Sequence, residues 1–237
     1  MTNRRSFLKQ ASLVSAPFIL PSQIWAAKGE ASPNNRINIA IIGPGKMGRT
    51  HAHKLIRNPR VQITGFAEIA DVRTKHTRDL IEKHYSQNTP SNKWKGLKVT
   101  KNYLELLEDK SLDAVLIATP DHWHGEATIR AARAKKHVYC EKPISLTIKE
   151  GRSMAMAVKE NNIVFQTGSQ QRSEYGGKFR RTVEMVRSGA IGELKKIRVC
   201  VGAPPKPCDL PTEPTPAGID WDAWLGPAPK RGFNKIL

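Results

Sequence analysis

The sequence is poor in cysteine. Its three cysteines are Cys140, Cys200 and Cys208, and no two of them form a CxxC pair. This pattern excludes a small fold held together by a disulfide framework and offers no cysteine-based zinc site. Cys200 and Cys208 either form a bridge or remain free thiols.

Long apolar runs are also missing, so no membrane anchor is expected. The apolar stretch from Ala11 to Leu20 is too short for a stable anchor and contains Pro17. It follows NRRSFLK at residues 3–9, which resembles a twin-arginine export signal, Arg-Arg-x-Phe-Leu-Lys. We therefore predict a signal peptide over 1–27, a linker over 28–35 and a periplasmic or otherwise exported protein. The alternative is a basic amphipathic N-terminal arm.

Acidic residues are scarce relative to basic ones. The sequence has 39 Lys and Arg against 21 Asp and Glu, a formal net charge of +18. Such a charge favours anionic partners such as nucleotides or acidic saccharides. The basic residues are scattered, without a Lys/Arg block or a basic strand interleaved with aromatics, so nucleic-acid binding is not expected.

Paired histidines raise the possibility of a metal site. His51 and His53, and His122 and His124, stand two residues apart, a spacing that some metal hydrolases use. The first pair falls on a predicted helix, where positions i and i+2 face different ways. No carboxylate–histidine set follows downstream, so we predict no metal and interpret His124 as a residue of a cofactor loop. Trp123 is interpreted as a packing or substrate-wall aromatic.

Strands and helices alternate from residue 36 to 166. Apolar β-branched runs predict buried strands, and amphipathic segments between them predict helices. The expected strands are 37–42, 61–69, 97–100, 114–118, 137–141 and 163–168. Helices are expected over 72–85 and over 145–162, the latter with Ser145 as N-cap. This order predicts an α/β doubly wound parallel sheet of the Rossmann type.

A glycine-rich turn follows the first strand. Gly43, Gly45 and Gly48 have the spacing G-x-G-x-x-G, with a strand before them and a helix after them. Gly43 permits the tight turn, Gly45 lets a pyrophosphate approach the backbone, and Gly48 lets the helix pack closely on the strand. Glu68 ends the second strand, where a carboxylate can accept both ribose hydroxyls. It would repel a 2′-phosphate, so NAD is favoured over NADP, although Arg73 and Lys75 lie close enough in sequence to soften that preference.

Two further segments are expected at the same edge, because ligands of parallel sheets bind outside the carboxyl ends of the strands. Thr119 and Pro120 leave one strand where a nicotinamide ribose could meet the Thr hydroxyl. Lys142 follows the next strand, where its amine can hydrogen-bond a substrate hydroxyl and exchange a proton with it. Pro143 fixes the turn, and a cis peptide bond is one way to do so.

Together these motifs resemble the glucose–fructose oxidoreductase / inositol dehydrogenase / MocA (Gfo/Idh/MocA) family, from about Ile37 to the end. The family's nucleotide loop is matched by Gly43, Pro44, Gly45, Lys46, Met47 and Gly48. Its nicotinamide-side loop is matched by Ala118, Thr119, Pro120 and His124, and its signature tripeptide by Glu141, Lys142 and Pro143. The resemblance implies that all these residues except Pro143 bind the cofactor, and that Lys142 also binds substrate and is catalytic. Gln170, Gln171 and Arg172 are either substrate ligands or a polar inter-domain loop.

The sequence departs from the family in two places. Ala134-Lys135-Lys136-His137 lacks the glycine often found before the next strand, so Lys135 either adopts a left-handed conformation at a cost of about 1 kcal/mol or the turn differs. The resemblance also implies a long second domain that supplies an Asp and a His near the substrate. Residues 167–237 are interpreted as the incomplete start of that α+β domain, with the Asp and His expected beyond residue 237. The full-length form is expected to be a homo-oligomer.

The resulting hypothesis is an NAD(P)-dependent oxidoreductase that transfers hydride between the nicotinamide and a sugar, a polyol such as an inositol, or a sugar derivative. One alternative is an exported glycoside-cleaving relative that uses NAD transiently. Another is a dinucleotide-binding protein without turnover.

Overall fold

The computed structural model describes residues 35–89, 93–203 and 209–237. The predicted signal peptide and nearly all of the predicted linker lie outside these ranges, as does Cys208. The described helices and strands all belong to one unit, Ile37–Leu237. Within the described ranges no helix has the length and apolar character needed to cross a membrane.

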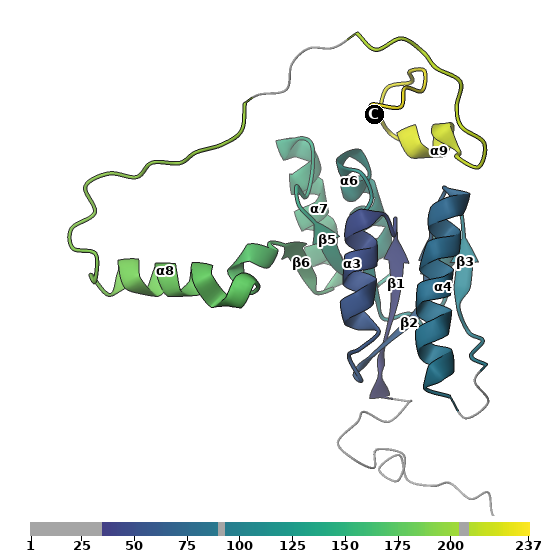
Figure 1. Cartoon of the computed structure of the whole chain (residues 1–237), viewed down its shortest axis with the longest axis horizontal. Helices are drawn as coiled ribbons and strands as arrows, with labels where there is room; N and C mark the ends of the chain where they lie inside the picture. The colour runs from purple at the N-terminus through teal and green to yellow at the C-terminus, as the bar shows by residue number, and fades with distance from the viewer. Residues whose placement is uncertain (1–34, 90–92, 204–208) are drawn as a thin grey trace, which may run out of the picture. The chain divides into compact units, whose positions relative to one another are not determined.

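A parallel sheet of six strands forms the centre of this unit (Figure 1). In sequence order the strands are β1 Ile37–Ile42, β2 Val61–Ala67, β3 Lys98–Thr100, β4 Ala114–Ile117, β5 His137–Glu141 and β6 Phe165–Gly168. Their order across the sheet is β3-β2-β1-β4-β5-β6, and each neighbouring pair is parallel. The chain thus starts in the middle and winds outward in both directions, which confirms the predicted doubly wound sheet.

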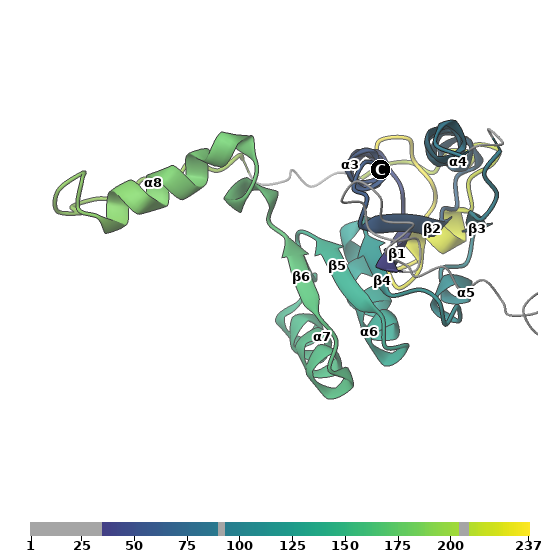
Figure 2. The same ribbon diagram turned by 90° about the horizontal axis from the view of Figure 1, so that it is seen from below.

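Helices cover both faces of the sheet (Figure 2). One face carries α3 and α4, whereas the other carries α5, α6 and α7. Their bounds are α3 Lys46–Leu55, α4 Asp71–Gln87, α5 Leu104–Leu107, α6 His124–Arg133 and α7 Ile148–Asn161. This arrangement follows because the crossovers are right-handed. The chain moves across the sheet in one direction from β1 and in the other from β4, so the helices that follow lie on opposite faces.

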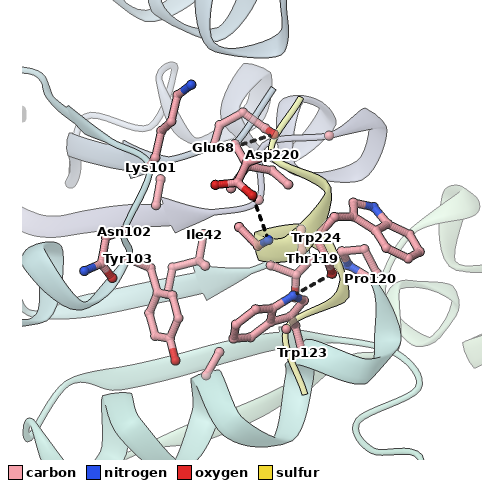
Figure 3. A pocket seen from close by; sticks show the side chains of 18 of the residues that line it. Ile42, Glu68, Lys101, Asn102, Tyr103, Thr119, Pro120, Trp123, Asp220 and Trp224 are labelled. Carbon is pink, nitrogen blue, oxygen red and sulfur yellow. Dashed lines mark hydrogen bonds between the residues drawn. The ribbon is translucent and has the colours of Figure 1, made fainter. Parts of the chain in front are cut away.

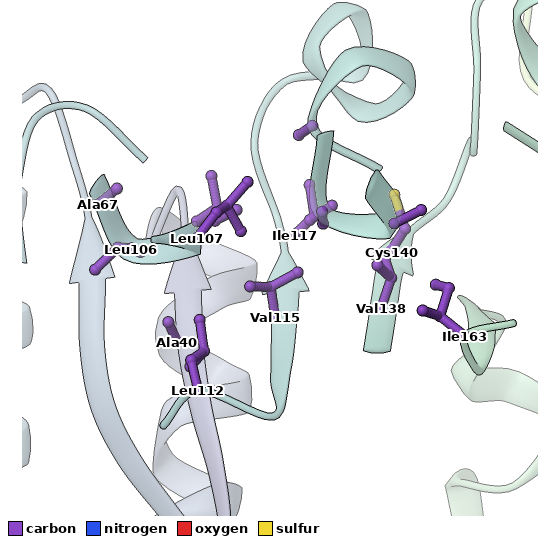
Figure 4. Close-up of a cluster of buried hydrophobic side chains, with 14 of the residues drawn as sticks. Ala40, Ala67, Leu106, Leu107, Leu112, Val115, Ile117, Val138, Cys140 and Ile163 are labelled. Atoms are coloured by element: carbon purple, nitrogen blue, oxygen red, sulfur yellow. The ribbon is translucent and has the colours of Figure 1, made fainter. Parts of the chain in front are cut away.

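The apolar strands divide their side chains between two cores. Ile41 and Phe66 belong to the cluster under α3 and α4, while Ala40 and Ile42 belong to the cluster under α5, α6 and α7. Figure 4 shows the second cluster, in which Val115 and Ile117 of β4 lie on the same side of their strand. Because neighbouring residues of a strand face opposite ways, a strand buried on both faces must be apolar at every position.

The structure shows how α7 begins and how the chain turns after α6, which the sequence alone did not decide. The N-cap of α7 is Thr147, whose side chain accepts a hydrogen bond from Glu150 N, so the prediction of Ser145 as N-cap was wrong. Thr147 and Glu150 have capping-box spacing, and Glu150 Oε2 in turn accepts from Leu146 N at 2.8 Å. Lys135, after α6, has φ 60°, which confirms the left-handed turn without glycine.

In the described parts of the chain beyond β6 there are four short elements. They are the 3-10 turns η3 Gln170–Arg172 and η4 Tyr175–Gly177, and the helices α8 Lys178–Arg187 and α9 Trp221–Leu225. Residues 178–203 are exposed throughout. By contrast, the stretch before α9 is paired with the segment between β2 and α4, through an antiparallel bridge between Ala70 and Ile219.

Candidate functional site

The carboxyl ends of β1, β4, β5 and β6 are level with one another. Ile42 pairs with Ile117, Ile117 with Cys140, and Cys140 with Thr167. The segments that follow therefore leave the sheet from one edge. The structure brings the glycine turn, the Thr119 segment and the Lys142 turn together there, in that order.

The three glycines of the turn have different surroundings. Gly43 has φ +75°, and a Cβ there would lie 2.8 Å from Thr119 Cγ2. At Gly48 a Cβ would lie 2.8 Å from the carbonyl oxygen of Gly43, so helix α3 could not pack as closely on the turn. At Gly45 the nearest atom to such a Cβ is Arg73 Nη1 at 4.0 Å, which leaves open space over the backbone. Gly45 is the N-cap of α3 and offers no side-chain cap, so the first N–H groups of the helix can serve an anion.

A cavity of about 380 Å³ opens beside this turn (Figure 3). Of the predicted cofactor-binding residues, Gly43, Gly45, Glu68, Ala118, Thr119 and Pro120 line it. The others, Pro44, Lys46, Met47, Gly48, His124, Glu141 and Lys142, are not among its lining residues. The cavity therefore corresponds to one part of the predicted cofactor site, on the side of Glu68.

Glu68 and Thr119 give this cavity its polar character. The Glu68 side chain is buried, and its Oε1 accepts hydrogen bonds from the backbone N–H groups of Ile69 and Ala70, both at 2.9 Å. These bonds fix the carboxylate and leave Oε2 for a ligand. The Thr119 hydroxyl is buried and has no hydrogen-bond partner within the described part of the chain. A buried polar atom of this kind normally has a partner, so a ligand that supplies one fits here.

These residues fit a nicotinamide dinucleotide. Glu68 can accept the ribose hydroxyls of the adenosine, the open backbone at Gly45 admits the pyrophosphate, and Thr119 can hydrogen-bond the central part of the ligand. Among the described residues, no three His, Cys, Asp or Glu side chains are grouped so that they could hold a metal ion.

At the end of β5, Glu141 is buried and is not among the residues that line the cavity. Its Oε1 lies 2.6 Å from His51 Nε2 and also accepts from the Gln170 amide, while Oε2 accepts from Lys142 N at 3.3 Å. Glu141 therefore joins helix α3, strand β5 and turn η3. Lys142 is exposed, and its peptide bond to Pro143 is cis.

His124 connects the two loops of this side. The ring is 1% exposed, with Nε2 2.9 Å from the carbonyl oxygen of Thr119 and Nδ1 2.6 Å from that of Pro143. In this structure His124 thus holds the loops in position. Of the predicted substrate residues, Gln170 bonds to Glu141, while Gln171 and Arg172 are exposed on the same 3-10 turn.

Sequence reasoning missed several cavity-lining residues. Tyr103, Asp220 and Trp224 line the cavity, together with Trp123, which had been interpreted as a packing or substrate-wall residue. Burial, with the nearby Glu126 carboxylate, raises the pKa of Tyr103 to about 12, so its hydroxyl stays neutral. No local pattern predicts that Trp224 lines the cavity, because its position depends on how a distant segment folds onto the sheet.

Comparisons with known proteins identify the family and the fold of the matched part of the chain. Residues 37–169 match the Gfo/Idh/MocA oxidoreductase family, described as an NAD-binding Rossmann fold. Myo-inositol 2-dehydrogenase of Thermotoga maritima is 32% identical over 174 residues, which cover 73% of this chain and 48% of that protein. A glycosyl hydrolase family 109 protein of Stenotrophomonas maltophilia is 26% identical over 243 residues, 93% of this chain and 49% of that protein.

The solved structure of myo-inositol 2-dehydrogenase from Lactobacillus plantarum superposes with a TM-score of 0.56 at 27% identity, covering 67% of this chain and 43% of that one. The chain spans about half the length of the curated relatives it matches, 50% and 48% in two of them. The matched region contains all six strands and the carboxyl edge with its glycine turn. The chain belongs to the Gfo/Idh/MocA oxidoreductase family, and its matched part is that family's NAD-binding Rossmann fold.

Proposed function

We propose that the protein is an NAD(P)-dependent oxidoreductase that acts on a sugar, a polyol such as an inositol, or a sugar derivative. The observation that carries this proposal is the level row at the carboxyl edge, where the glycine turn, Thr119 and Lys142 follow neighbouring strands. A dinucleotide bound across that row has its pyrophosphate at Gly45 and its nicotinamide near Lys142. The inositol dehydrogenases among the relatives support the substrate class.

When bound, the nicotinamide ring supplies the hydride chemistry. Lys142 is positioned to hold the substrate hydroxyl by a hydrogen bond from Nζ and to exchange its proton. The Lys142 backbone N–H is bonded to Glu141, which His51 and Gln170 hold in turn, so the base of the lysine is fixed while its exposed side chain reaches the substrate. Gln171 and Arg172, exposed on the adjoining turn, are candidates for contacts with substrate hydroxyls.

We infer NAD as the preferred cofactor, because a buried carboxylate at Glu68 repels a 2′-phosphate. The test is a titration with NADH and with NADPH, followed by quenching of tryptophan fluorescence. Glu68→Gln keeps an acceptor for Ile69 N and Ala70 N but removes the charge. The substitution should weaken NADH binding about tenfold, or ~1.4 kcal/mol, and should reduce the difference in affinity between NADH and NADPH. Asp79→Asn, at an exposed carboxylate on α4 paired with Lys75, is the matched control and should bind as the parent does.

A parent protein that binds no nicotinamide dinucleotide would overturn the proposal. If it binds, the same preparation is tested with NAD and a panel of sugars and inositols, and NADH formation is followed by absorbance. The alignments cover only 50% and 48% of two of the relatives, so the activity of the whole enzyme stays a proposal that this assay tests.

A glycoside-cleaving activity is the second candidate. Similarity to the glycosyl hydrolase family 109 protein extends over 93% of this chain, a larger share than for the inositol dehydrogenase of T. maritima. Release of free sugar from a chromogenic glycoside, dependent on added NAD, would favour this candidate over simple dehydrogenation.

We further propose export by the twin-arginine route, on the basis of Arg4, Arg5 and the Phe7-Leu8-Lys9 that follows. This route carries folded proteins, so the cofactor would be bound before export and held tightly afterwards. Replacing Arg4 and Arg5 together by lysine should leave the protein in the cytoplasm. Unchanged secretion of the double variant would contradict the assignment.

A further inference from the structure

The cavity has a wall that lies far outside the region matched by the family. Residues 218–226, here called the strap, comprise Gly218, Ile219, Asp220, helix α9 and Gly226. The family model matches residues 37–169, so the strap follows that match by about fifty residues.

One end of the strap is attached beside Glu68. The backbone N–H of Asp71 donates to the carbonyl oxygen of Gly218 at 2.9 Å, and Ala70 and Ile219 form an antiparallel bridge. Ala70 is also a residue whose N–H binds the Glu68 carboxylate. The strap thus begins at the carboxyl end of β2, where the ribose of an adenosine is expected.

The other end is attached beside the Thr119 segment. Trp123 Nε1 donates to the carbonyl oxygen of Trp224 at 3.0 Å, and His122 Nε2 lies 2.8 Å from the same oxygen. The rings of His122 and Trp224 also pack together, with centroids 5.0 Å apart. The strap therefore crosses the cavity from the end of β2 to the loop after β4, as Figure 3 shows for Glu68, Asp220, Trp224 and Trp123.

Contacts within the strap and to Trp123 hold its second half, while Gly218, Asp220 and Asp222 are exposed. Leu225 is 2% exposed, and the Asp220 side chain caps α9 by accepting from Ala223 N at 2.9 Å. Trp221 stacks on Trp224 with centroids 4.6 Å apart and an angle of 14° between the rings. At Gly226, which has φ +47°, a Cβ would lie 2.0 Å from the Trp123 ring. Such a close approach is possible only without a side chain.

Four residues of the strap face the cavity, namely Asp220, Ala223, Trp224 and Gly226. Gly43, Gly45 and Glu68 line the same cavity. The walls thus combine the aromatic residues Tyr103, Trp123 and Trp224 with two carboxylates, Glu68 and Asp220. Aromatic faces stack on nucleobases, and carboxylates accept hydrogen bonds from ribose hydroxyls.

We propose that the strap binds the adenosine half of the dinucleotide and retains it, with Asp220 as a second carboxylate toward the ribose and Trp224 as a wall for the adenine. This inference rests on the proposed nicotinamide dinucleotide function. Because the strap is attached on both sides of the cavity, opening of either attachment should speed the release of the nucleotide. A second carboxylate also repels a 2′-phosphate and so strengthens the preference for NAD, whereas the positive charge of Arg73 acts in the other direction.

The rate of NADH release tests this proposal. NADH is bound to the full chain, an excess of ADP-ribose is added as a trap, and the loss of NADH fluorescence is followed by stopped flow. Gly226→Ala, which forces the strap away from Trp123, and Trp224→Ala should each release NADH at least about tenfold faster. Asp222→Asn is the matched control, because on the same helix it removes only the exposed ion pair with Lys230, and it should release NADH at the parent rate.

A measurement on the parent protein avoids the question of whether a variant folds. Saturating ADP-ribose, which contains the adenosine half, should slow hydrogen exchange at the amides of residues 218–226. Nicotinamide mononucleotide, which lacks that half, should leave exchange there unchanged. Unchanged exchange with ADP-ribose bound, or parent release rates in both strap variants, would overturn the role of the strap while NADH binding itself still stood. A parent that binds no dinucleotide would instead overturn the proposed function.

Discussion

Substitution of Gly45 by alanine should separate nucleotide binding from folding. The residue has φ −68°, which any residue adopts, and its new Cβ would meet no atom closer than Arg73 Nη1 at 4.0 Å. Alanine is poorer than glycine as an N-cap by up to about 1 kcal/mol. Alanine also has less conformational freedom than glycine in the unfolded chain, and this effect offsets about 0.4–1 kcal/mol of the capping cost. The free energy of unfolding should therefore stay within about 1 kcal/mol of the parent.

Nucleotide affinity should behave differently, because the same Cβ occupies the space through which the pyrophosphate approaches the backbone. We expect Gly45→Ala to weaken NADH binding at least tenfold, a loss of about 1.4 kcal/mol or more. Fluorescence titration measures the affinity, and urea denaturation of the same preparation measures stability.

Gly48→Ala is the comparison variant. Its Cβ would lie 2.8 Å from the Gly43 carbonyl oxygen and 3.5 Å from Ala118 Cβ, so α3 must move away from the turn. We expect a loss of stability of about 1–3 kcal/mol. If Gly45→Ala bound NADH like the parent, or lost as much stability as Gly48→Ala, the assignment of Gly45 to the pyrophosphate would be refuted.

Three further predictions concern the nicotinamide side and the core. His51→Ala leaves the buried Glu141 carboxylate without its 2.6 Å partner, so urea denaturation should show a loss of about 2 kcal/mol; an unchanged midpoint would refute the contact. Lys142→Met, at an exposed side chain, should change stability by less than about 0.5 kcal/mol but lower dehydrogenase turnover at least about a hundredfold; unchanged turnover would remove Lys142 from the chemistry. Burial raises the pKa of Cys140 from 9.0 to about 12 and that of Tyr139 from 10.0 to about 12. The fold thus favours the neutral thiol and the neutral phenol, and their contribution to the free energy of unfolding is complete below pH 9 and is lost as pH rises toward 12. A free energy of unfolding that stays constant across that pH range would contradict this.

The sheet could be predicted from the sequence because its signals are local. β1 and β4 are continuous apolar runs, the glycine turn stands between a strand and a helix, and strand–helix alternation implies parallel order. The predicted place of Glu68 follows from the same logic, since an acid at the end of β2 must lie at the carboxyl edge. The start of α7 was predicted at the wrong residue, Ser145 in place of Thr147. Both residue types are good N-caps, and only the hydrogen bond from Glu150 N to the Thr147 side chain decides between them.

The contacts between distant segments could not be predicted in this way. Glu141 and His51 are 90 residues apart, and neither residue type indicates that they form a buried pair. The same is true of the wall formed by Trp224, whose carbonyl oxygen bonds to Trp123 at a separation of 101 residues. Such contacts depend on how a whole segment packs onto the fold, which local periodicity does not encode.

The central claim is that a nicotinamide dinucleotide lies across the carboxyl edge of the sheet, from the glycine turn to Lys142. A crystal structure of the chain with NADH bound tests it most directly. The account predicts the pyrophosphate within hydrogen-bond distance of the backbone at Gly45, the adenosine ribose on Glu68 and the nicotinamide beside Thr119 and Lys142. NADH bound at the opposite edge of the sheet, or with its nicotinamide remote from the Lys142 amine, would contradict it.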